Sequence, residues 1–300
     1  MHKARIVLLL LAAYSCAAQT PTPELIKSTD TNPAIQHSTG TDVVLRPAKL
    51  KDAPLLLWIP GTSGHPERYL PFLNVIASQG YRVIGLPYNT APSITDSCAA
   101  LLDPACPEQL RTLRTWGSDV STPAPVAAIP SANVPTAESI TGRLVALLQL
   151  LATGHPEEGW QTFLTSDNKP VWSKIAVAGQ SQGAGMAALI AKKERVPRVI
   201  LFSNPADTTG GLDNPQLARW LTWPSATPMD RWYAERNSRE PLNGTLTKTY
   251  AALKIPPAHI HVFSLDLPPD AKQDDPGAYH MTNIQDPRYI PEWKLLFGTP

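Results

Sequence analysis

The sequence has little of what marks several large classes of protein. Among its 300 residues there are three cysteines, and a formal net charge of +1 comes without any cluster of basic residues. Nucleic-acid-binding proteins concentrate lysine and arginine on one face, so we expect no nucleic-acid partner. There is also no glycine-rich dinucleotide or phosphate loop and no His-Glu-x-x-His motif. These absences argue against nucleotide chemistry and against the common zinc hydrolases.

The N-terminus has the pattern of a secretory signal peptide over residues 1–18. A basic start is followed by an apolar stretch that is too short to span a bilayer. Cleavage after Ala18 satisfies the small-residue requirement, while Cys16 allows a lipid anchor as the less favoured alternative. We therefore expect a secreted or periplasmic protein without a transmembrane span, whose oligomeric state the sequence does not indicate.

Two further segments frame the expected domain. Residues 19–40 are rich in Thr, Pro, Ser and Asn without apolar periodicity, which predicts a flexible arm before a domain over 41–300. Cys98 and Cys106 stay in the exported chain, and an oxidising compartment favours a disulfide between them. The chain-entropy model gives a loop this short roughly 2.5 kcal/mol of stabilisation.

Apolar runs typical of strands alternate with helical patterns along this domain. We expect strands over 54–60, 81–88, 196–203 and 259–265 and immediately before residue 181, and helices over 67–79, 136–153, 244–254 and 287–297. This alternation predicts a single α/β domain with a mostly parallel central sheet flanked by helices. Two irregular, tryptophan-bearing insertions, 89–135 and 207–241, interrupt it, and the first is expected to lie over the site as a candidate lid.

The most informative segment places Ser181 at the tip of a sharp turn between a buried strand and a helix. A serine on such a strained turn needs glycine two residues to either side, because side chains there would collide. Gly179 and Gly183 occupy those two positions. Ser181 is therefore the candidate nucleophile.

A serine hydroxyl needs a base within hydrogen-bond reach. Of the histidines that follow Ser181, His259 and His261 alternate within an expected strand, where packed or solvated side chains are more common. His280 lies in a loop beyond the last expected strand, from which it can reach the turn. We therefore expect His280 to be the base.

The base in turn needs a carboxylate to orient it. Asp266 directly follows the strand expected over 259–265, which gives the order Ser, Asp, His. It is our first choice, with Asp207 and Asp270 as alternatives. For the oxyanion hole, we expect one backbone N–H from Gln182, at a helix start, and a second from Thr62 in the glycine-containing loop 60–65.

These motifs resemble those of the α/β-hydrolases, and in more detail an uncharacterised bacterial subgroup of secreted or periplasmic serine hydrolases. Ile59-Pro-Gly-Thr62 is similar to their Leu-Pro-Gly-Thr-like oxyanion loop, and Gly179-Gln-Ser-Gln-Gly183 to their Gly-His-Ser-Gln-Gly-like elbow, with Gln180 in place of the usual histidine. The resemblance covers about residues 50–300. It implies hydrolysis of a small-molecule or polymer-linked ester, as by a carboxylesterase, through an acyl-enzyme on Ser181 and without a cofactor.

Other interpretations stay open. Acyl transfer to another acceptor and peptide-bond cleavage use the same machinery. The fold could also serve a non-catalytic exported binding protein whose two insertions form the ligand surface. A metal hydrolase built on His259, His261 and a nearby aspartate is the least favoured alternative.

Overall fold

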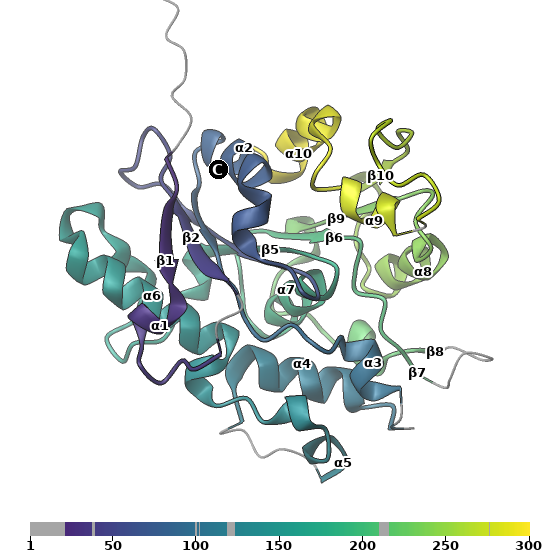
Figure 1. Ribbon diagram of the computed structural model, residues 1–300, viewed down its shortest axis with the longest axis horizontal. Helices are drawn as coiled ribbons and strands as arrows, with labels where there is room; N and C mark the ends of the chain where they lie inside the picture. The colour runs from purple at the N-terminus through teal and green to yellow at the C-terminus, as the bar shows by residue number, and fades with distance from the viewer. Residues whose placement is uncertain are drawn as a thin grey trace, which may run out of the picture.

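Eight strands form a single mixed sheet in the computed structural model (Figure 1). The structure describes residues 22–37, 40–99, 101, 103–118, 124–209, 216–275 and 277–300, so the expected signal peptide and Cys16 lie outside the described residues. The order across the sheet is β1-β2-β4-β3-β5-β6-β9-β10. From β4 to β10 all neighbours are parallel, whereas β2 is antiparallel to both β1 and β4.

The strands are short and most are buried. They are β1 Glu24–Lys27, β2 Thr41–Leu45, β3 Leu55–Ile59, β4 Arg82–Gly85, β5 Ile175–Gln180, β6 Val199–Phe202, β9 Trp232–Asn237 and β10 Ile260–Phe263, with β7 Thr208–Thr209 and β8 Gln216–Leu217 forming a separate pair. The α-helices are α1 Ser28–Thr31, α2 Leu70–Ser78, α3 Ile94–Cys98, α4 Cys106–Trp116, α5 Ala124–Ala127, α6 Ile140–Gly154, α7 Gln182–Lys193, α8 Asn243–Ala252, α9 Ala278–Thr282 and α10 Ile290–Phe297.

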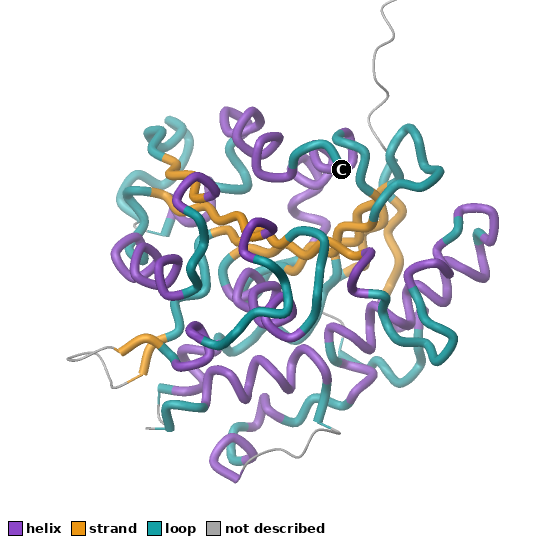
Figure 2. The backbone as a smooth tube through the Cα atoms, turned by 180° about the vertical axis from the view of Figure 1, so that it is seen from behind, coloured by secondary structure: helices purple, strands orange, loops and turns teal. Residues whose placement is uncertain are grey.

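Helices cover both faces of the sheet, which is why its central strands are continuous apolar runs. Leu55, Leu57 and Ile59 of β3 face the layer that contains α4, α6, α7 and α8. Leu56 and Trp58 of the same strand face α2 and α10 on the other side. Figure 2 shows the strands crossing the middle of the molecule with helices above and below. The expected α/β class with a mostly parallel sheet is confirmed.

The N-terminal boundary differs from the expectation. Residues 24–27 are not part of a flexible arm but form β1, which pairs with β2 at the edge of the sheet. Ser28 and Ile35 are buried as well. The sequence does not indicate this strand, because alternate residues of the edge strand stay exposed, Leu25 among them, and no apolar run marks it.

The insertion expected over 207–241 also contains a strand, β9, which lies between β6 and β10. It reads Trp-Tyr-Ala-Glu-Arg-Asn, and it buries Glu235 and Asn237 completely. Such polar residues interrupt the apolar run by which a buried strand is predicted from sequence. This strand matters for the site, because the loop beyond its carboxyl end carries Glu240.

Across the part of the chain that the structure describes, we find no helix with the length and apolar character that a membrane span requires.

Candidate active site

Ser181 lies on a strained turn between β5 and α7. Its φ of 52° and ψ of −130° fall in a region that few non-glycine residues adopt. A Cβ on Gly179 would lie 2.4 Å from the carbonyl carbon of Gly183, and a Cβ on Gly183 would lie 2.0 Å from the carbonyl oxygen of Ile59. The expected steric need for both glycines is confirmed, since backbone rather than movable side chain occupies the space.

The loop after β3 lies directly against the turn. A Cβ on Gly61 would be 2.9 Å from the Cβ of Ser181. The next residue, Thr62, lines the same cavity as Ser181 and Gln182, and its N–H donates no hydrogen bond within the described residues. Gln182 begins α7, where an N–H has no acceptor inside the helix. Both expected oxyanion donors therefore lie beside Ser181.

The Gln182 side chain fixes this end of α7 to the segment after β4. Its Nε2 donates to the Thr90 carbonyl oxygen at 2.7 Å, and its Oε1 accepts from Ile94 N at 2.8 Å and from Arg114 Nη1 at 3.1 Å. A buried amide with its hydrogen bonds satisfied has one stable orientation. The backbone N–H of Gln182 is thus held in place by its own side chain.

His280 lies in α9 and contacts a buried carboxylate. Its Nδ1 is 2.8 Å from Oε2 of Glu240, whose side chain is fully buried. Oε1 of Glu240 accepts from Asn237 N at 2.7 Å and from Ser203 Oγ at 3.1 Å. Because Glu240 occupies Nδ1, the nitrogen of His280 that remains for other contacts is Nε2.

Gln180, the residue before the serine, connects the turn to α9. Its Nε2 donates to the His280 carbonyl oxygen at 3.4 Å. Ser181 and His280 therefore lie at the same end of the sheet, although in the described structure no hydrogen bond joins Ser181 Oγ to the His280 ring. Catalytic hydrogen bonds often tighten only when substrate is bound.

The expectation that Asp266 orients His280 is not met. The Asp266 side chain is 84% exposed and forms an ion pair with Arg239, whose guanidinium lowers the pKa of this carboxyl. Arg288 donates to its backbone oxygen. The carboxylate next to His280 is Glu240, because β9 lies between β6 and β10 and its loop leads toward α9.

The two alternative acids do not contact His280 either. Asp207 is buried, and Arg111 binds it through Nη2 at 2.6 Å and Nε at 2.7 Å, while Trp220 Nε1 donates to it at 2.8 Å. Asp270 is exposed in the loop after β10. Asp207 thus forms a buried ion pair with Arg111, and both residues line the cavity beside Ser181.

A cavity of about 670 Å³ opens beside Ser181. Its apolar wall comes from the first insertion, in which the expected disulfide between Cys98 and Cys106 is confirmed and joins α3 to α4. Other lining residues come from the segment after β6 and from the start of α8. The residues that line it include Ile94, Cys98, Leu101, Pro107, Ala206, Leu242, Thr95, Thr208, Thr209 and Thr245.

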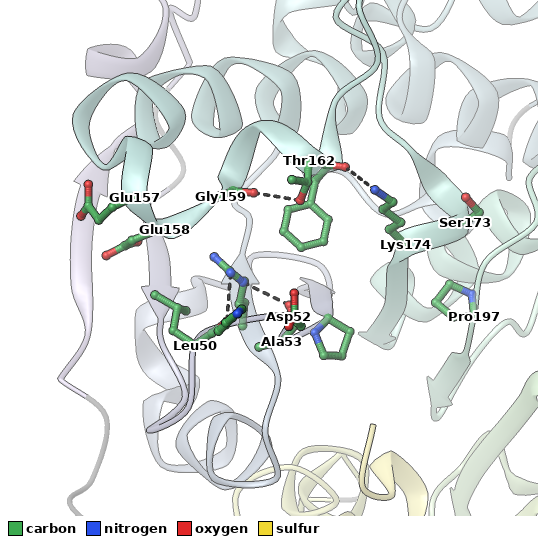
Figure 3. Close-up of a pocket in the computed structure, with 14 residues that line it drawn as sticks. Leu50, Asp52, Ala53, Glu157, Glu158, Gly159, Thr162, Ser173, Lys174 and Pro197 are labelled. Carbon is green, nitrogen blue, oxygen red and sulfur yellow. Dashed lines mark hydrogen bonds between the residues drawn. The ribbon is translucent and has the colours of Figure 1, made fainter.

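A second cavity, of about 730 Å³, lies at the amino ends of the central strands (Figure 3). Residues that precede β3 and β5 line it, such as Ala53 and Lys174, and Figure 3 shows Glu157 and Glu158 on one side of it. Ligand sites in parallel sheets lie beyond the carboxyl ends of the strands. The cavity beside Ser181 has that location and this second one does not.

The strand order, the antiparallel β2, the serine turn after β5 and the histidine after β10 together define the α/β-hydrolase fold. No protein-family model matches the sequence, and no curated protein matches it.

Several solved structures are similar at low identity. Esterase B from Lactobacillus rhamnosis is 14% identical with a TM-score of 0.47, over 93% of this chain and 87% of the other. Carboxyl esterase 2 from Tuber melanosporum is 12% identical with a TM-score of 0.44, over 95% and 87%. Dienelactone hydrolase from Anabaena variabilis is 13% identical with a TM-score of 0.42, over 92% and 98%. We base the fold on the strand order rather than on these likenesses.

Proposed function

We propose that the protein is an exported serine hydrolase that cleaves carboxylic esters through an acyl-enzyme on Ser181, with His280 as base and Glu240 as the carboxylate that orients it. The observation that carries the proposal is the 2.8 Å contact between His280 Nδ1 and the buried Glu240, at the same sheet end as the strained serine. A buried carboxylate on Nδ1 fixes the tautomer whose Nε2 accepts a proton.

The proposed reaction has two halves, acylation and deacylation of Ser181, and His280 acts as base and then as acid in each. Nε2 of His280 accepts the proton of Ser181 Oγ while Oγ attacks the ester carbonyl. The oxyanion that forms is stabilised by the N–H groups of Gln182 and Thr62, each worth roughly 3 kcal/mol in the transition state. His280 then gives its proton to the leaving alcohol. Water, deprotonated by the same nitrogen, attacks the acyl-enzyme carbonyl; the bond to Ser181 Oγ breaks, Oγ takes the proton back from His280, and the carboxylic acid leaves.

The cavity favours an uncharged acyl group. Arg111 is a cation that lines the cavity, and both of its carboxylate contacts go to Asp207, while its Nη1 donates to the Gln182 carbonyl oxygen at 3.0 Å. A charged acyl group would have to compete with this satisfied buried pair. The apolar side chains of the α3–α4 wall are compatible with an aliphatic or aryl acyl group.

The test compares wild type, Ser181→Ala and Ser173→Ala on short-chain aryl esters. Ser173 is exposed and lines the other cavity, so its variant is a matched control. We expect Ser181→Ala to lose activity by a factor on the order of 10⁴ or more, and Ser173→Ala to match wild type. A fluorophosphonate probe should label Ser181 alone. Equal activity in wild type and Ser181→Ala would refute the proposal.

The second candidate is a non-catalytic binding protein on the same fold. The specific observation for it is the missing hydrogen bond between Ser181 and His280. A folded wild type that neither cleaves esters nor reacts with the probe would favour this candidate. Export is tested separately, by mass spectrometry of the N-terminal peptide of the secreted protein.

A further inference from the structure

A second glutamate lies completely buried behind the pair of His280 and Glu240. Glu235, in β9, has no exposed surface. The Ser203 hydroxyl lies between the two acids, with its Oγ 3.1 Å from Glu240 Oε1 and 3.5 Å from Glu235 Oε2. Asn283 Nδ2 donates to the same Oγ at 2.6 Å. The hydroxyl therefore joins the carboxylate of the proposed catalytic site to a carboxyl that the mechanism leaves unused.

The hydrogen bonds around Ser203 assign one proton to this pair of acids. A hydroxyl has one proton to donate and two lone pairs, and Asn283 already occupies one lone pair. If both glutamates were ionised, they would compete for that single proton, and the charge of Glu235 would extend onto Oε1, which has no hydrogen-bond partner in the described structure. An unpaired neutral carbonyl oxygen costs less in a buried site than an unpaired ionised oxygen. If Glu235 is protonated, it donates to Ser203, and Ser203 donates to Glu240. Every donor then has an acceptor.

The charges around Glu235 favour the same assignment. Tyr250 of α8 donates to its backbone oxygen at 2.7 Å, and Tyr289 approaches from the segment before α10. Arg236, the neighbouring cation whose charge opposes the rise in the pKa of Glu235, is hydrogen-bonded to Asn243. Burial and the negative charge of Glu240 raise the pKa of Glu235 well above its ordinary value.

Glu240 holds the negative charge of the pair. It accepts a backbone N–H from Asn237 and contacts the His280 ring, so donors surround its two oxygens. Glu235 has neither contact. The two acids are thus chemically similar but differ in the donors that the fold provides.

We propose that Glu235 is a neutral carboxylic acid that, through the hydroxyl of Ser203, positions the Glu240 carboxylate against His280. The catalytic role of Glu235 rests on the function proposed above, whereas its protonation state does not depend on that function. Glu235 and Ser203 are positioning residues, because neither touches the reacting atoms. The network carries one negative charge, which is the charge that the imidazolium of His280 needs during the reaction.

The protonation is tested without any activity assay. We expect wild type to show the infrared carbonyl band of a protonated carboxyl at about pH 8.5, above the pKa of Asp42, which burial raises to about 7. Glu235→Gln should remove this band, and Asp42→Asn should not. A wild-type spectrum without a protonated carboxyl at that pH would overturn the proposal, and this measurement needs no variant to fold.

Stability provides a second readout. A carboxyl whose pKa is raised by folding stabilises the protein below its unfolded pKa, and this contribution is lost as pH rises toward the folded value. The unfolding constant of wild type relative to Glu235→Gln should therefore rise about tenfold per pH unit above about pH 4.5. A ratio that does not change with pH would mean that Glu235 is ionised in the folded protein.

The positioning role is tested by kinetics. Glu235→Gln keeps the shape and a donor for Ser203, so kcat and the lower limb of the pH profile of kcat/KM should stay within about twofold of wild type. Ser203→Ala breaks the link, and we expect about a tenfold loss in kcat with little change in KM. A lower limb that moves to lower pH in Glu235→Gln would show that a negative charge was removed, and would overturn the proposal. If the protein proves inactive, the infrared and stability results still decide the protonation of Glu235.

Discussion

Replacing Glu240 with glutamine changes one charged oxygen into an amide NH₂ at a position that the fold determines. Asn237 N and Ser203 Oγ both donate to Oε1, so the amide oxygen will occupy that position. The NH₂ group then faces His280 Nδ1 at the 2.8 Å contact. Two N–H donors cannot face each other, so Nδ1 must become the acceptor and Nε2 must carry the proton. The base then has the wrong tautomer.

We expect kcat of Glu240→Gln on an aryl ester to fall by about 10³ to 10⁴, as for other orienting carboxylates, which corresponds to about 4–5.5 kcal/mol. Stopped-flow or steady-state spectrophotometry measures this loss, and a thermal melt verifies that the variant folds. Asp266→Asn is the matched control: its side chain is 84% exposed, and it should retain activity within about twofold. If Glu240→Gln retains more than about a tenth of kcat, or if Asp266→Asn shows the large loss, the assignment of the acid is refuted.

Three further predictions concern stability. Gly183→Ala places a Cβ 2.0 Å from the Ile59 carbonyl oxygen and should lower the free energy of unfolding in urea by about 3 kcal/mol or more, whereas Gly154→Ala, with open space around it, should not lower it. Similar urea midpoints for the two variants would contradict the steric account. Burial raises the pKa of Asp42 from 3.8 to about 7, so its contribution to the free energy of unfolding is full below about pH 4 and is lost as pH rises through about 7. The free energy of unfolding of Asp42→Asn should therefore rise relative to wild type by about 1.4 kcal/mol per pH unit in this window, and a difference that does not change with pH would be evidence against the raised pKa. Replacing Cys98 and Cys106 together by serine should lower the free energy of unfolding by roughly 2.5 kcal/mol, and an unchanged value would show that the crosslink contributes nothing.

The parts of the site that sequence reasoning found are those fixed by local sterics. Gly179 and Gly183 must lack side chains because adjacent backbone fills the space, and this constraint appears in the sequence as a motif around Ser181. The parallel sheet is also predictable from local sequence. Strands buried on both faces need apolar residues at successive positions, so they appear as short apolar runs, as in β3 and β5.

Glu240 was missed because its identification depends on β9. That strand buries Glu235 and Asn237, and their partners Ser203 and Asn283 come from distant segments of the chain. No local pattern shows such pairing. Without β9, the sequence predicts the acid either in the loop after β10, which carries Asp266 and Asp270, or at Asp207 after β6. The alternation of Trp232 and Ala234, both buried, was the one available signal.

The walls of the Ser181 cavity come from segments outside the eight-stranded sheet, among them α3, the start of α4, residues around Thr208 and the start of α8. The nucleophile, its glycines and the proposed oxyanion loop are held by backbone contacts within the sheet loops themselves. Substitutions at Leu101 or Thr208 can therefore reshape the cavity without disturbing the turn. A directed-evolution library aimed at a new acyl preference should be confined to these wall positions, because there a change in selectivity carries little risk to the chemistry.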